Sequence, residues 1–100
     1  MEIKGKVALV TGAAHRVGKA IALGLAERGA HIVVHYHQSA DHARATVEEI
    51  RRKNVRAIAI GGDLATRAGV EAVFDAAQAE FGGVDILVNS AAIMEAADLL

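Results

Sequence analysis

The sequence contains no cysteine and no proline, and only 3% of its 100 residues are aromatic. Without cysteine the chain can form neither disulfides nor thiolate metal sites, and the compartment we expect is the cytoplasm. With so few aromatic rings, the core must be built from valine, isoleucine, leucine and alanine.

Neither sign of charge is in excess, since the formal net charge is -1 and the pI is about 6.5. A nucleic-acid-binding surface needs a basic field, so we expect no nucleic-acid partner. No apolar run approaches the roughly 20 residues that span a bilayer, and Lys4 and Lys6 interrupt the place of a signal peptide, so we expect no membrane partner. The remaining composition, 53% hydrophobic and 23% charged, is typical of at most one globular domain.

An apolar run near the N-terminus leads through glycine into a helical pattern. Val7 to Val10 suits a strand buried on both faces. The apolar residues that follow at helical spacing are Val17, Ala20, Ile21, Gly24 and Leu25. A strand that enters a helix through glycines leaves the first N–H groups of the helix unpaired, where the helix dipole favours an anion. This geometry suits the pyrophosphate of a nucleotide.

The spacing of this loop distinguishes two kinds of nucleotide-binding turn. A P-loop needs four residues between its glycine and Gly-Lys, then Ser or Thr, but five residues separate Gly12 from Gly18, and Ala20 replaces the hydroxyl. The form Gly-x-Gly-x-x-Gly does not fit either, since residues 14 and 17 are Ala and Val. The pattern that fits is Thr-Gly-x-x-x-Gly-x-Gly with Arg16 in place of the middle glycine. A plain tight turn is the structural alternative.

The rest of the chain alternates strand and helix signals. We expect strands over residues 31–35, 56–60 and 86–88, and helices over residues 16–28, 40–53 and from Thr66 to Gly82. Gly29 and Gly82-Gly83 should end the first and third helices, and Ser39 and Thr66 should cap the second and third. The residues expected to face inward are Ala43, Val47 and Ile50 in the second helix and Val70, Val73, Phe74, Ala77 and Phe81 in the third.

Four strands alternating with three helices through short connections predict an α/β fold, an incomplete Rossmann-type doubly wound parallel sheet with helices on both faces. In such sheets ligands bind beyond the carboxyl ends of the strands, where the winding reverses between the first and fourth strands. Asp63-Leu64 and Asn89 to Ala92 follow the third and fourth strands and should lie there. Asp63 has an alternative role in supporting the turn before Thr66.

Four landmarks in register along the chain are similar to those of the short-chain dehydrogenase/reductase family. They are Thr11 to Gly18, Tyr36 to Ser39, Asp63-Leu64, and Asn89 to Ala92, which is similar to the family's Asn-Asn-Ala-Gly. The variant Thr-Gly-Ala-Ala-x-Arg-x-Gly most resembles the pteridine reductase branch. The resemblance covers residues 5–100 and implies an NADP-dependent oxidoreductase that transfers a hydride between nicotinamide and a carbonyl, imine or alcohol substrate.

The catalytic residues that the resemblance implies are not in this sequence. They are a Tyr followed four residues later by Lys, and an upstream Ser, all beyond residue 100 of a typical member, whereas the only tyrosine here is Tyr36 and residue 40 is Ala. We therefore expect residues 1–100 to be the N-terminal part of a single NAD(P)-binding domain, inactive alone. The resemblance implies a full-length homo-oligomer, dimer or tetramer, acting on a small molecule. The alternative is a nucleotide-binding or regulatory module without catalysis.

The end of the second strand addresses the identity of the cofactor. NAD-specific folds place an Asp or Glu there, about 20 residues beyond the glycine loop, to bind the ribose hydroxyls. That place falls on Tyr36, and no carboxylate appears before Asp41. The strand runs into His37-Gln38-Ser39, similar to His-Arg-Ser of pteridine reductases, and Arg16 lies opposite. Guanidinium, imidazole and hydroxyl would clamp a 2′-phosphate, so we expect NADP rather than NAD.

The residues expected to contact the dinucleotide come from the ends of all four strands. They are Gly12, His15, Arg16, Val17, Gly18, Tyr36, His37, Ser39, Asp63, Leu64, Asn89, Ser90 and Ala91. His31, His35 and His37 alternate onto one face of the second strand, but zinc sites need a fourth ligand and a hydrogen-bonded outer shell. We therefore expect no metal site.

Overall fold

The structure, a computed structural model, describes residues 2–14 and 16–90. Its elements in chain order are β1 (Val7–Val10), α1 (Arg16–Glu27), β2 (His31–Tyr36), α2 (Ala40–Arg51), β3 (Ala57–Gly61), α3 (Arg67–Phe81) and β4 (Ile86–Val88). This order confirms the type of every expected element, and no end differs from the expected one by more than two residues. Within the described part, no helix is both long and apolar enough to cross a membrane.

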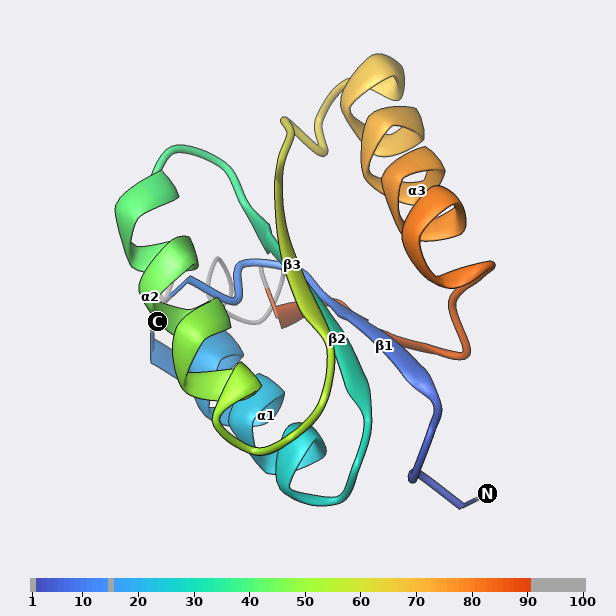
Figure 1. The fold of residues 1–100 in the computed structure, drawn as a ribbon. Coiled ribbons are helices and arrows are strands. Elements are labelled where there is room, and N and C mark those ends of the chain that lie inside the picture. The colour runs from blue at the N-terminus through green and yellow to red at the C-terminus, as the bar shows by residue number, and fades with distance from the viewer. Residues whose placement is uncertain (1, 15, 91–100) are drawn as a thin grey trace.

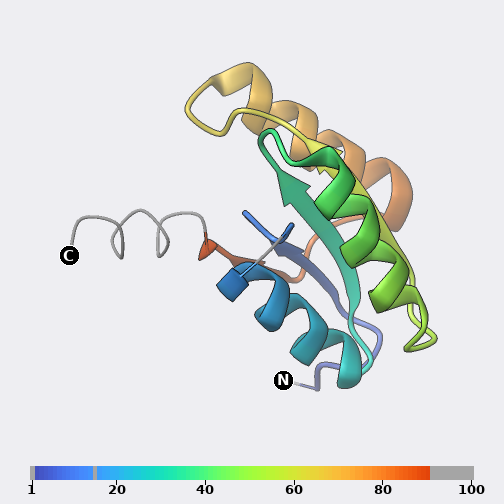
Figure 2. The same ribbon diagram turned by 90° about the vertical axis from the view of Figure 1, so that its left-hand side faces the viewer.

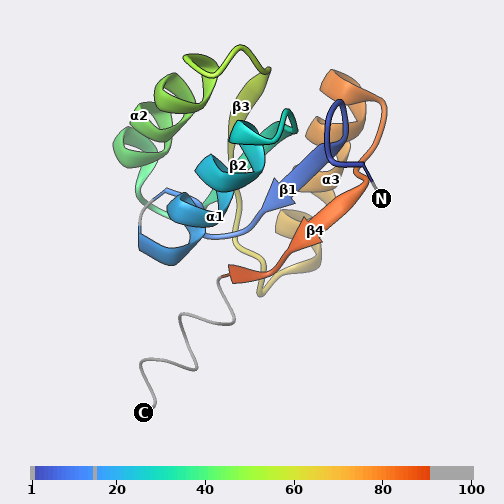
Figure 3. The same ribbon diagram turned by 90° about the horizontal axis from the view of Figure 1, so that it is seen from below.

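The four strands form one parallel sheet in the order β3-β2-β1-β4. The helices α1 and α2 lie on one face of the sheet and α3 lies on the other (Figures 1 and 2). The chain moves outward from β1 to β3 and then returns to the other side of β1, where β4 pairs (Figure 3). This is a partial Rossmann fold, and its winding reverses between β1 and β4, where ligands bind in open α/β sheets.

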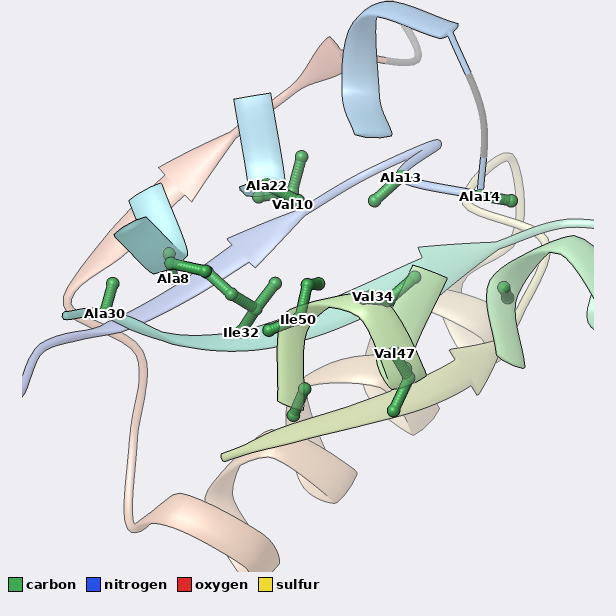
Figure 4. Packing of buried hydrophobic residues seen from close by; sticks show 13 residues of the cluster. Ala8, Val10, Ala13, Ala14, Ala22, Ala30, Ile32, Val34, Val47 and Ile50 are labelled. Atoms are coloured by element: carbon green, nitrogen blue, oxygen red, sulfur yellow. The ribbon is translucent and has the colours of Figure 1, made fainter. Parts of the chain in front are cut away.

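The core has two parts because successive residues of the buried strands face opposite sides of the sheet. On the side of α1 and α2, Ala8, Val10, Ile32 and Val34 meet helix residues such as Ile50 (Figure 4). A smaller cluster on the other side comprises Val7, Leu9, Val33, Val73 and Ala77. The fully buried apolar residues are aliphatic throughout the described ranges, as the scarcity of aromatic residues requires.

The buried face of α1 differs from the one expected from its large apolar residues. Gly18, Ala22 and Ala26 are the buried residues of this helix, whereas Val17 is 46% exposed and Ala20 is exposed. Small residues four apart let a helix lie close to the sheet, and the larger Ile21 and Leu25 then fill the flanks as half-buried side chains.

The inward faces of the other two helices follow the expectation more closely. Ala43, Val47 and Ile50 are buried in α2, as expected. In α3, Val73 and Ala77 are buried and Phe81 is half-buried, but Val70 and Phe74 are 36% and 40% exposed. Among the described residues α3 is the only helix on its face of the sheet (Figures 1 and 2), so no neighbouring helix covers the apolar residues at its sides.

The ends of the helices confirm three expected signals and correct one. Thr66 Oγ1 accepts the Gly69 N–H at 3.0 Å, and Gly29 and Gly82 adopt left-handed φ angles of 92° and 82° after α1 and α3. Ser39 occupies the N-cap position of α2 but makes no side-chain cap bond. Its backbone, with φ -92° and ψ 62°, lies outside the extended conformation that usually accompanies such a bond.

Candidate functional site

The turn between β1 and α1 is compact because two glycines meet in it. Gly12 has a φ of 62°, a conformation that favours glycine. A Cβ placed on Gly18 would lie 2.3 Å from the Gly12 oxygen and 2.7 Å from Ser90 Oγ. The start of α1 therefore rests directly on the turn, and any side chain at position 18 would push the helix away.

The same turn is tied to the neighbouring elements before any ligand binds. The Gly12 N–H donates to His35 Nδ1 at 3.0 Å, and the Ala13 N–H donates to the His35 carbonyl at 2.9 Å. From α2, the hydroxyl of Thr46 donates to the Ala14 carbonyl at 2.9 Å. These hydrogen bonds pair the inward-facing polar groups of the loop with other groups of the protein. The shape of the loop is therefore fixed without a ligand.

Neither His35 nor Thr46 is predicted from the sequence as a site residue for the loop. Both are polar and buried, with exposures of 3% and 0%. The signal that could have found them is a polar residue at a position whose periodicity demands an apolar one, because buried polar groups need partners. The identity of those partners depends on how distant segments meet, which no local pattern contains.

The N-terminus of α1 provides the N–H groups that the inner loop does not. The first N–H groups of a helix have no intrahelical partner, and here they begin at Arg16 and Val17. The first turn of α1 carries no acidic residue, so no carboxylate in that turn opposes an anion. His15 lies outside the described residues, and its expected contact with the dinucleotide stays a prediction.

Arg16 adopts a left-handed backbone conformation with a φ of 58°, and its side chain is exposed. It stands where the loop pattern has its middle glycine, so the conformation suited to glycine persists without it. A non-glycine residue in this region costs about 1 to 2 kcal/mol. Strain of this kind clusters at binding sites, where the position of a side chain compensates for it.

The end of β2 carries no carboxylate before Asp41, as the sequence indicates, and Asp41 is exposed and paired with Arg44 at 3.2 Å. Tyr36 is half-buried, and its ring lies so close to Gly61 that a Cβ there would be 2.9 Å from it. The strand end is therefore occupied by a neutral aromatic side chain that packs along β3.

The loops after β2 and β3 approach each other through His37 and Asp63. The His37 Nε2 lies 4.0 Å from Asp63 Oδ2, and both side chains are about half exposed. Asp63 Oδ1 also accepts the Ala65 N–H at 2.9 Å, which is the turn-supporting role given above as its alternative. Leu64 packs half-buried against the smaller core cluster, and Ser39 is half-buried at the start of α2.

The carboxyl ends of β1 and β4 are joined by polar side chains. Thr11 Oγ1 lies 3.3 Å from the Val88 carbonyl and 3.1 Å from Asn89 Oδ1. Ser90 is fully buried and donates its hydroxyl to the Thr11 carbonyl. The expected site residues Asn89 and Ser90 thus join the segment after β4 to the end of β1, while Ala91 lies outside the described residues.

The strand histidines are engaged separately rather than together. His31 Nδ1 accepts the Arg56 N–H at 3.0 Å, and its ring stacks on Phe81 with centroids 6.0 Å apart. Both ring nitrogens of His35 are hydrogen-bonded to backbone groups. No three metal-ligating side chains converge anywhere in residues 2–14 and 16–90.

The chain belongs to the short-chain dehydrogenase family, whose model matches residues 6–100. Among curated relatives, it is 46% identical over 88 residues to the 3-oxoacyl-[acyl-carrier-protein] reductase FabG of Staphylococcus epidermidis, covering 88% of this chain and 36% of that protein. It is 44% identical to the hydroxynaphthalene reductase-like protein Arp2 of Metarhizium robertsii, covering 88% of this chain and 33% of that one. The chain thus spans 33% to 36% of the length of these relatives.

Solved structures agree with this family membership. A putative dehydrogenase from Burkholderia cenocepacia with bound NADP superposes with a TM-score of 0.84 at 36% identity, over 88% of this chain and 34% of that one. The L-sorbose reductase of Gluconobacter frateurii, in complex with NADPH and L-sorbose, superposes with a TM-score of 0.80 at 40% identity, over 87% of this chain and 34% of that one.

The finer resemblance to the pteridine reductase branch is corrected by these relatives. They are named a 3-oxoacyl-[acyl-carrier-protein] reductase and a hydroxynaphthalene reductase-like protein, not pteridine reductases. The loop variant with Arg16 and the His37 to Ser39 segment are too short to define a branch. The comparisons therefore show membership of the short-chain dehydrogenase family and of no particular branch of it.

Proposed function

We propose that this chain supplies the N-terminal part of a single NAD(P)-binding domain in an NADP-dependent oxidoreductase. The complete enzyme would transfer a hydride between nicotinamide and a carbonyl, imine or alcohol substrate. The observation that carries the proposal is the preformed loop beneath the N-terminus of α1, placed where the winding of the sheet reverses. NADP and NADPH bound to two related structures support it.

We propose that each part of the dinucleotide would meet a different part of the site. The pyrophosphate would lie at the first N–H groups of α1, above Gly12 and Gly18. The adenosine would lie between Asp63 and Leu64 on one side and the end of β2 on the other. The nicotinamide, which supplies or accepts the hydride, would reach toward Asn89 and the segment after it.

The preference for NADP would follow from what surrounds the ribose. Arg16 projects from the exposed start of α1, and His37 and Ser39 follow β2. We propose that these three side chains bind the 2′-phosphate. Tyr36 stands where NAD-specific folds have a carboxylate, so no negative charge on β2 repels the phosphate.

The test is a binding titration of NADP and NAD to the full gene product and to single variants. Arg16→Ala should weaken NADP binding about ten- to a hundred-fold, because a charge-assisted contact contributes about 1.5 to 3 kcal/mol, and should leave NAD binding nearly unchanged. Tyr36→Asp should weaken NADP binding selectively, because it places at the end of β2 the carboxylate of NAD-specific folds, which repels a 2′-phosphate.

Arg52→Ala is the matched control for Arg16→Ala. Arg52 is also an exposed arginine at a helix end, but it lies at the C-cap of α2, at the opposite end of that helix from Ser39. Its loss should change the affinity for neither cofactor. Equal affinity of the parent for NAD and NADP, or an equal loss in both arginine variants, would contradict the assignment of NADP.

A nucleotide-binding or regulatory module is the second candidate, because the preformed loop beneath the N-terminus of α1 would bind a dinucleotide with or without catalysis. Tyr36, the only tyrosine among these 100 residues, packs on Gly61. The candidates differ in turnover: the enzyme oxidises NADPH in the presence of a carbonyl substrate, whereas the binding module holds NADPH unchanged.

A further inference from the structure

We propose that His35 is a positioning residue that sets the shape of the phosphate loop, and through it the affinity for the dinucleotide, by holding two backbone groups with one neutral imidazole. The proposal rests on the proposed function in so far as the loop binds NADP. The two hydrogen bonds between the His35 ring and the loops are present in the protein without ligand.

The position of His35 allows it to reach two loops at once. It lies near the carboxyl end of β2, which is paired with β1 on one side and β3 on the other. Its Nδ1 lies 3.0 Å from the Gly12 nitrogen, in the loop after β1. Its Nε2 lies 2.8 Å from the Gly62 oxygen, just after β3. One side chain, 3% exposed, thereby joins the phosphate loop to the loop that carries Asp63.

The chemistry of the two partners fixes the protonation of the ring. Gly12 offers an N–H, so Nδ1 must present its lone pair, and Gly62 offers a carbonyl oxygen, so Nε2 must carry the hydrogen. Only the neutral tautomer protonated on Nε2 satisfies both groups. The other neutral tautomer, or a ring protonated on both nitrogens, would point an N–H at the N–H of Gly12.

The consequence for binding is a division of roles among the N–H groups of the loop. The Gly12 and Ala13 N–H groups point inward, to the side chain and the carbonyl of His35. The phosphate must then be met by the first turn of α1. Because the Gly12 oxygen lies against Gly18, a shift of Gly12 would displace the start of that helix. His35 therefore controls where the phosphate-binding N–H groups stand.

Three substitutions separate the two hydrogen bonds. In His35→Asn the amide oxygen takes the position of Nδ1 and can accept from Gly12, but the bond to Gly62 is lost. In His35→Gln the longer side chain carries its amide nitrogen to the position of Nε2 and can donate to Gly62, but the bond from Gly12 is lost. His35→Leu removes both bonds at similar volume. If the leucine variant fails to fold, the two amides still decide the question.

His31 offers a matched control on the same strand. Its Nδ1 also accepts a backbone N–H at 3.0 Å, from Arg56, but at the amino end of β2, away from the phosphate loop. His31→Leu therefore removes a backbone-to-imidazole hydrogen bond of the same length without touching Gly12, and it is the control for His35→Leu. We expect it to affect folding stability only.

The affinity experiment is an NADP titration of the full gene product and these variants, with thermal unfolding in parallel. His35→Gln and His35→Leu should lose about ten-fold in affinity, as expected for one misplaced hydrogen-bonded group, whereas His35→Asn should stay within about three-fold of the parent. His31→Leu should bind NADP like the parent. A purely structural role would instead lower affinity in step with stability, with no rescue by asparagine.

The second experiment needs no cofactor. Nitrogen NMR of the ligand-free protein should show His35 with Nδ1 unprotonated and Nε2 protonated, and the Gly12 amide should exchange slowly with solvent in the parent and His35→Asn but faster in His35→Gln. A proton on Nδ1, or full NADP affinity in a folded His35→Leu variant, would overturn the proposal. Failure of the parent to bind NADP would overturn the proposed function, while the tautomer and the Gly12 exchange would still decide the hold on the loop.

Discussion

At the scale of single residues, the backbone of Arg16 combines a structural cost with the proposed contact to the 2′-phosphate. Its φ of 58° favours glycine, so the two roles of the position can be separated by substitution. Arg16→Gly removes the guanidinium and relieves the backbone strain of the left-handed conformation. Arg16→Ala removes the guanidinium but leaves that backbone strain in place. We expect the glycine variant to be more stable than the alanine variant by about 1 kcal/mol.

Urea unfolding of both variants measures this difference, and NADP titration supplies the second readout. Both variants should lose NADP affinity equally, because neither keeps the guanidinium. Equal stability of the two would contradict the left-handed conformation of Arg16. Retained NADP affinity in the glycine variant would contradict its contact with the phosphate.

At the scale of elements, α1 contains two glycines with opposite surroundings. A Cβ on Gly18 would meet the backbone of Gly12, whereas a Cβ on Gly24 would meet nothing within 4 Å. Gly18→Ala should destabilise the protein by about 1 to 3 kcal/mol through overpacking. Gly24→Ala should stabilise it by about 0.5 to 1 kcal/mol, because glycine in a helix interior is unfavourable.

Chemical denaturation of the two alanine variants tests this placement of α1 on the loop. NADP affinity should fall in Gly18→Ala, since the displaced helix start carries the phosphate-binding N–H groups, and should be unchanged in Gly24→Ala. A Gly18→Ala variant as stable as the parent would contradict the close contact between Gly12 and Gly18.

The elements also mark how far the sequence alone can predict this fold. Strands, helices and the Thr66 and Gly82 caps follow from signals within a few residues, and these expectations are confirmed. The inward face of α1 does not follow from such local signals. The helix lies close to the sheet, and this close approach buries its smallest residues, such as Ala22, rather than its largest. The contacts of His35 and Thr46 with the loop join segments far apart in sequence, so periodicity could not reveal them.

At the scale of the whole molecule, β4 forms one edge of the described sheet and leaves apolar surface accessible. Leu87 pairs in register with the buried Leu9 but is itself 58% exposed. Exposed apolar strand edges recruit other chains. We expect the purified polypeptide of residues 1–100 to be marginally stable or to self-associate at micromolar concentration, and Leu87→Lys to reduce the association.

Sedimentation of the parent and the lysine variant over a range of concentrations measures this. Glu2→Lys, which adds the same basic side chain at another exposed position, is the control and should associate like the parent. A monomeric parent with one cooperative unfolding transition would contradict the expectation.

For the polypeptide of residues 1–100, we expect cofactor binding without hydride transfer. The polypeptide of residues 1–100 has the preformed loop and the neutral end of β2, so we expect it to bind NADP wherever it remains folded. Hydride transfer to a carbonyl needs a proton donor near the reacting carbon as well. The phenol of Tyr36 belongs to a half-buried ring packed on Gly61 at the end of β2, and the nicotinamide is proposed to lie beyond β4, on the other side of β1. We therefore expect no NADPH oxidation above background with any carbonyl substrate, measured by loss of absorbance under conditions in which titration shows saturation with NADPH. Turnover by this polypeptide, abolished by Tyr36→Phe, would show that Tyr36 donates the proton and would overturn the division of roles proposed here.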